Sequence, residues 1–81
     1  MAIIRMSATL DYTVVFEPQA EGGYTVSVPA LPEVVTEGET EAEALQMAKE
    51  AICLVLDYRR DHGLPLPADA PPTVRKVTVP A

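Results

Sequence analysis

Residues 24–48, YTVSVPALPEVVTEGETEAEALQMA, decide the fold because the spacing of the hydrophobic residues changes within them. As far as Val28, apolar and polar side chains alternate, a pattern typical of a half-buried strand. From Thr40 the sequence TEAE is a capping box, in which the Thr40 hydroxyl can accept from the Glu43 amide and the Glu43 carboxylate can reach back. Apolar residues then recur at helical spacing, so the stretch predicts strands followed by a helix.

The predicted helix runs from the Thr40 cap to about Asp61, roughly 21 residues or about 30 Å. Gly63 is the candidate for the left-handed residue after the helix, and Pro65 forbids its continuation. The apolar residues of the helix form a main stripe and a shoulder beside it. The main stripe comprises Ala44, Leu45, Ala48, Ala51, Ile52 and Val55, and the shoulder comprises Met47, Leu54 and Tyr58. Together they make an apolar face that is wider than one sheet should cover.

Alternating residues predict further strands on both sides of this helix. Every even position from residue 2 to 16 is apolar, which predicts a main strand at 10–17 that pairs with 24–28 through a turn at 18–23. A short third strand is expected at 34–37, and weak alternation after a proline-rich connection predicts a last strand at about 73–79. The expected fold class is α+β: one domain over residues 1–81, with its core at about 10–67. It is a two-layer, mainly antiparallel sheet with one long helix packed on one face, in the order β-β-β-α-β.

The charge balance restricts the partners. The 81 residues include 12 acidic and six basic ones, for a net charge of −6. Such a chain repels phosphate backbones, so we expect no direct binding to nucleic acid and favour a basic protein partner. Cys53 is the single cysteine, which excludes an intrachain disulfide and favours a reducing interior. The sequence shows no apolar run of the ~18 residues that a membrane span needs and no convincing signal peptide. We therefore expect a cytoplasmic protein without membrane contact.

Catalytic chemistry finds little support in the sequence. Cys53 and His62 are nine residues apart on one helix, which places them on opposite faces with about 13.5 Å of rise between them. One His and one Cys do not make a zinc site. Tyr12, Phe16 and Tyr24 could stack on RNA bases, but their period-2 positions more often belong to a core. We expect no enzyme, no bound metal and no cofactor, although the carboxylates between residues 33 and 43 leave a metal-dependent enzyme open as a weaker alternative.

The ordered motifs of the chain resemble the HicB-like antitoxin family. The pieces are YTVVFE at 12–17, EGGYTVSVPALP at 21–32, TEGETEAEA at 36–44 and AKEAI at 48–52, and the match covers roughly residues 10–67. The resemblance implies a partial ribonuclease H-like domain without that enzyme's catalytic carboxylates. It also implies an antitoxin of a type II toxin–antitoxin system that binds and neutralises HicA, a small basic toxin that cleaves mRNA. The sequence departs from the family's usual Gly-Cys at Glu33-Val34.

Many members of the family add a C-terminal DNA-binding domain, for which we expect no room in 81 residues. The alternative function is a stand-alone, self-assembling structural or regulatory protein without a toxin partner. We expect the partner surface to comprise Tyr24, Leu31, Glu33, Glu37, Glu39 and Glu41. We also expect a homo-oligomer, at least a dimer, whose interface comprises Ile3, Ile4, Met6, Met47, Leu54 and Tyr58.

Overall fold

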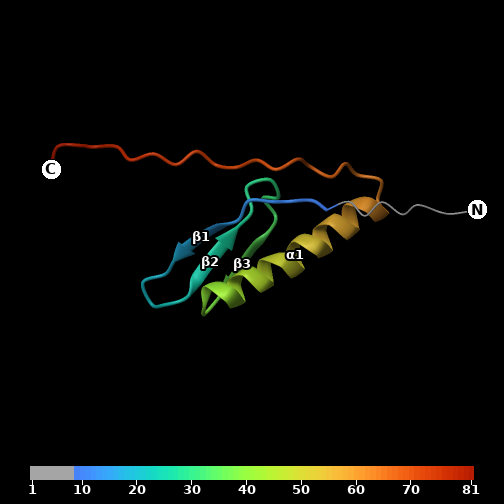
Figure 1. Cartoon of the computed structure of the whole chain (residues 1–81), viewed down its shortest axis with the longest axis horizontal. Coiled ribbons are helices and arrows are strands. Elements are labelled where there is room, and N and C mark those ends of the chain that lie inside the picture. The colour runs from blue at the N-terminus through green and yellow to red at the C-terminus, as the bar shows by residue number, and fades with distance from the viewer. Residues whose placement is uncertain (1–8) are drawn as a thin grey trace, which may run out of the picture.

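The structure is a computed structural model and describes residues 9–81. Three strands are followed by one long helix: β1 (Val15–Pro18), β2 (Tyr24–Ser27), β3 (Val35–Gly38) and α1 (Glu41–Asp61). The strands form an antiparallel sheet in the order β1-β2-β3, and α1 lies against one face of it (Figure 1). The predicted two-layer α+β fold is confirmed.

The first strand is shorter than predicted. It begins at Val15, and the expected residues 10–14 belong to no strand, although Tyr12 and Val14 still pack on the core. Pairing with β2 stops at Val15 opposite Ser27. Pro29 lies two residues after Ser27, and it has no N–H to continue the hydrogen-bond ladder between β1 and β2. Proline chemistry therefore sets the length of the hairpin.

The core lies between the sheet and the inward face of α1. Val26 of β2 packs with Ala44 and Ala48 near the start of the helix. The second buried cluster lies further along the helix, where Leu56 meets residues from the loop between β2 and β3. That cluster comprises Val28, Leu31, Val34 and Leu56.

Both ends of α1 are capped, and the N-terminal cap forms one half of the predicted capping box. The Thr40 hydroxyl accepts a hydrogen bond from the Glu43 N–H at 3.1 Å, whereas the hydrogen bonds of residues 9–81 include none from the Thr40 N–H to the Glu43 carboxylate. At the other end Gly63 takes a φ of 66° and donates to the Arg60 carbonyl, while the Leu64 N–H donates to the Arg59 carbonyl. These two bonds form a Schellman motif, which satisfies carbonyls that the helix leaves open. Within residues 9–81, no helix is both long and apolar enough to cross a membrane.

The predicted helix stripe needs one correction. Leu45 is half exposed, whereas Leu56, which the stripe omitted, is buried. The helix passes beyond the short strands, so its C-terminal half packs on the loop and turns Leu56 inward.

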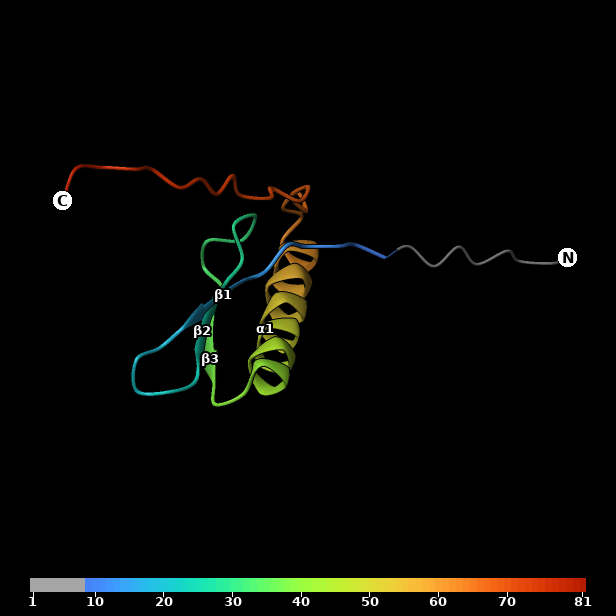
Figure 2. The same cartoon turned by 60° about the vertical axis from the view of Figure 1, so that its left-hand side comes forward.

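The strand predicted at 73–79 does not form, and the observed order is β-β-β-α. Every residue from 68 to 81 is exposed, and Figures 1 and 2 show the end of the chain as an extended trace that stays apart from the strands and the helix. Pro71 and Pro72 stand just before residues 73–79 and have no N–H groups with which to start a ladder.

Candidate functional site

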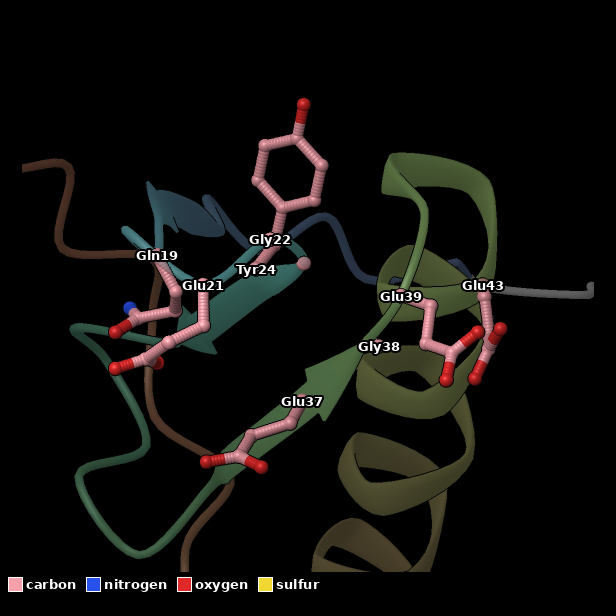
Figure 3. A pocket seen from close by; sticks show the side chains of 9 residues that line it. Gln19, Glu21, Gly22, Tyr24, Glu37, Gly38, Glu39 and Glu43 are labelled. Carbon is pink, nitrogen blue, oxygen red and sulfur yellow. The ribbon is translucent and has the colours of Figure 1, made fainter.

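A depression of about 390 Å³ lies where the β1–β2 turn, the end of β3 and the start of α1 meet. Four of its side chains are carboxylates, from Glu21, Glu37, Glu39 and Glu43, and we call this site the acidic depression (Figure 3). Its complete lining comprises Gln19, Glu21, Gly22, Gly23, Tyr24, Glu37, Gly38, Glu39 and Glu43.

Close backbone approach builds the floor of the acidic depression. A Cβ on Gly38 would overlap the backbone N and Cα of Ala44, so only glycine lets β3 run this close to the first turn of α1. Gly23 has a φ of 81° and lies against the Gly38 carbonyl. The pairing of Tyr24 with Gly38 explains this contact, because it brings the hairpin turn beside the end of β3.

The four carboxylates of the acidic depression have no basic partner within the described chain. The ion pairs formed by residues 9–81 join Arg59 to Glu33 at 3.0 Å and Arg60 to Asp57 at 3.1 Å. Figure 3 shows the carboxylates spread around the rim, with Glu39 and Glu43 together and Glu37 apart. In the part of the chain that the structure describes, no three His, Cys, Asp or Glu side chains are placed to hold a metal ion. The spread of charge suits an extended basic surface better than a single cation.

The predicted partner residues fall into different places. Glu37, Glu39 and Tyr24 line the acidic depression, and the Tyr24 ring meets Phe16 edge-to-face at 6.1 Å. Glu41 is exposed at the start of the helix, outside the lining. Glu33 lies on the β2–β3 loop, where the hydrogen bond from Arg59 is the main cause that lowers the pKa of its carboxyl group.

Leu31 was expected on the partner surface, but its side chain is fully buried in the core. Proline residues on both sides turn the loop back over the end of the sheet, and the Leu31 N–H donates to the Val28 carbonyl at 2.9 Å. The side chain therefore fills the space beneath the loop and cannot contact a partner in this structure.

The predicted oligomer residues on the helix are exposed. Met47, Leu54 and Tyr58 all present apolar surface on α1, and Leu54 is the most open of the three. Tyr58 also stacks on the His62 ring at 4.0 Å, and no hydrogen bond joins His62 to Cys53. The other three predicted residues, Ile3, Ile4 and Met6, lie outside the described residues.

Sequence reasoning missed the contributions of Gln19 and Glu21 to the acidic depression. The stretch around Glu21 indicated a turn and no part of a site. The register of the strands was the missing information, because it alone brings the turn beside the end of β3. Counting the residues of the turn before Tyr24 and of the strands after it could have suggested that this turn lies beside the end of β3.

Comparison with known proteins agrees with this architecture. The family described as "HicB_like antitoxin of bacterial toxin-antitoxin system" matches residues 12–78. The chain is 39% identical to Antitoxin HicB 1 of Photorhabdus laumondii over 71 aligned residues, and this alignment covers 88% of this chain and 46% of that protein. It is 48% identical to Antitoxin HicB of Escherichia coli K12 over 61 aligned residues, and this alignment covers 73% of this chain and 44% of that protein.

A shorter relative matches over most of its own length. The UPF0150 protein Ta0767 of Thermoplasma acidophilum is 40% identical over 60 residues, which cover 74% of this chain and 87% of that protein. The chain thus spans slightly less than half the length of the two HicB antitoxins. Because the family match includes all three strands and the helix, the chain belongs to the HicB-like antitoxin family of bacterial toxin–antitoxin systems.

Proposed function

We propose that this chain binds and neutralises a small, basic, mRNA-cleaving toxin of the HicA type, and that the acidic depression is the docking surface. The observation that carries the proposal is the set of four carboxylates that have no basic partner within residues 9–81. An RNA-cleaving toxin must present cationic groups to its substrate, and the same groups would meet this surface. The names of the two HicB relatives support the role of antitoxin.

Charge and apolar contact would contribute differently to binding: charge to the association rate, and apolar contact to the affinity. Exposed ion pairs contribute only about 0–1 kcal/mol each, so the carboxylates would mainly speed association. A tight complex also needs a desolvated anchor. Tyr24 lines the same acidic depression and is half-buried, so it is the anchor that we propose. The chain would act by occlusion without catalysis or cofactor, in the cytoplasm, where mRNA is translated.

Glu21→Gln with Glu39→Gln tests the acidic depression. Neither side chain makes a hydrogen bond or an ion pair with another described residue, so the fold should persist. We expect the association rate with the cognate toxin at low salt to fall on the order of tenfold, and its salt dependence to flatten. Stopped-flow mixing at several salt concentrations measures both quantities.

The matched control is Glu17→Gln with Glu50→Gln, which removes the same charge outside the acidic depression. It should alter the association rate much less. Equal effects of the two double variants would show that only net charge matters, and unchanged rates in both would show that the toxin is held elsewhere. Either result overturns the proposed site.

A further inference from the structure

Residues 73–79, which we call the arm, have the composition of a strand but no partner in the described chain. Five of the seven residues are Val or Thr, which favour strands. The side chains of Val74, Val77 and Val79 are 86%, 81% and 70% exposed. An extended segment with this much exposed apolar surface and unpaired backbone is a template for pairing with another chain.

The chain's own β1 can pair with little of the arm, because an anchor fixes where the arm starts. The Tyr12 hydroxyl donates to the Pro67 carbonyl at 2.6 Å, and the Thr13 N–H and hydroxyl donate to the Asp69 carboxylate at 2.9 and 2.7 Å. Residues 71 and 72, which would follow beside β1, are prolines without N–H groups. A chain that ran alongside β1 from this anchor would set these prolines beside Val15 and Phe16, and only the first two residues of the arm would lie beside β1 before it ends at Pro18.

The free edge of β3 is the better acceptor of an additional strand. β1 and β3 are the two edge strands, but β1 ends at Pro18 and its approach is occupied by the anchor. β3 contains no proline, and its Val35 is 61% exposed on the face of the sheet away from the helix. Glu37 lies on the same face two residues later.

We propose that the arm of one copy pairs antiparallel with β3 of a second copy. One register sets Arg75 opposite Glu37 and Val77 opposite Val35, which matches a cation with an anion and an apolar residue with another. Such cross-strand pairs stabilise sheets. The charge distribution supports the exchange, because the arm carries Arg75, Lys76 and no acidic residue, whereas the rest of the chain carries all 12 acidic residues.

The exchange of arms gives a closed dimer, not an open-ended chain of copies. Each copy has one arm and one free β3 edge, so two copies satisfy each other in a two-fold dimer without leaving either element open. The added strand would then satisfy the unpaired backbone groups along one side of each arm and set Val77 beside Val35. The exchange requires no toxin, so the isolated chain should dimerise by itself.

Sedimentation equilibrium of the 81-residue chain should show a dimer at micromolar concentration. Val74→Pro with Val77→Pro removes one N–H from each side of the arm and changes no charge. We expect this variant to raise the dimer dissociation constant on the order of tenfold or more, since each lost hydrogen bond contributes about 0.5–1.5 kcal/mol. The helix content should not change, because the arm contacts neither the sheet nor the helix. The matched control, Val74→Ile with Val77→Ile, should remain dimeric.

Three further substitutions identify the surfaces that form the dimer. Arg75→Glu and Glu37→Arg should each weaken the dimer, and the two together should restore it. Leu54→Lys places a charge on the exposed shoulder of α1 and should leave the dimer intact. A monomeric wild-type chain, a dimer insensitive to the proline variant, or a dimer lost through Leu54→Lys alone would overturn the proposal.

Cross-linking tests the register directly. In a Cys53→Ser background, Val35→Cys in one tagged chain should form a disulfide with Val77→Cys in a differently tagged chain. Preferential bonding of Val77→Cys to Val15→Cys would overturn the assignment to β3. A bond formed within a single chain that carries both Val35→Cys and Val77→Cys would overturn the exchange itself.

Discussion

At Gly38 the sheet approaches the helix so closely that one methyl group decides the fit. A Cβ there would overlap the backbone of Ala44, which cannot move aside as a flexible side chain would. We expect Gly38→Ala to lower the free energy of unfolding by about 1–3 kcal/mol, the usual cost of overpacking. Urea unfolding followed by circular dichroism measures it. A change below about 0.5 kcal/mol would show that β3 can move away from α1 at little cost.

Asp69 makes the anchor of the arm sensitive to acid. The hydrogen bond from the Thr13 N–H, followed by that from the Thr13 hydroxyl, lowers the pKa of the Asp69 carboxyl below its ordinary 3.8. Because the folded pKa is the lower one, the stabilisation is fully present above pH 3.8 and is lost as the pH falls through the folded value. Thr13→Val keeps the N–H and removes the hydroxyl, so the pKa of Asp69 should rise partway toward 3.8. An NMR titration of the Asp69 carboxyl carbon checks this, and an unchanged pKa would contradict it.

Among the elements, α1 is capped at its N-terminus by a single side-chain hydroxyl, that of Thr40. The Thr40 Oγ accepts from the Glu43 N–H, which would otherwise lack a partner within the helix. Thr40→Ala should therefore lower the free energy of unfolding by about 1 kcal/mol, whereas Thr40→Ser should preserve most of it. Chemical denaturation of the two variants checks the difference. Equal losses from alanine and serine would mean that the hydroxyl does not act as the cap.

The helix was predictable because its signals are local. Thr40 begins it, Gly63 follows it, and both assignments depend on residues within one turn. The burial of Leu31 and the absence of a strand at 73–79 depend on how distant segments meet, which alternation alone does not encode. The same limit applies to the acidic depression: Glu37 and Glu39 were expected there, but Glu21 joins them only through the register of the hairpin.

In the whole molecule, Glu37 belongs both to the proposed toxin surface and to the edge strand that would receive the arm. This residue lines the acidic depression, and in the proposed exchange it lies opposite Arg75 of a second copy. A toxin that binds the acidic depression should therefore displace the arm, and added toxin should convert the dimer into a complex with one copy of each protein. Light scattering coupled to gel filtration gives the stoichiometry. A stable assembly that contains two copies of this chain with toxin bound to each would contradict the competition.

The length of α1 divides the helix into two halves with different packing partners. Its 21 residues outreach strands of only four, so its first half is held by the sheet through Ala44 and Ala48, and its second half by the loop beneath Leu56. Amide hydrogens on the two halves should therefore exchange with solvent through different opening events. Leu31→Ala should speed hydrogen–deuterium exchange in residues 54–61 much more than in residues 44–50. Equal acceleration along the helix would instead mean that sheet, loop and helix open as one cooperative unit.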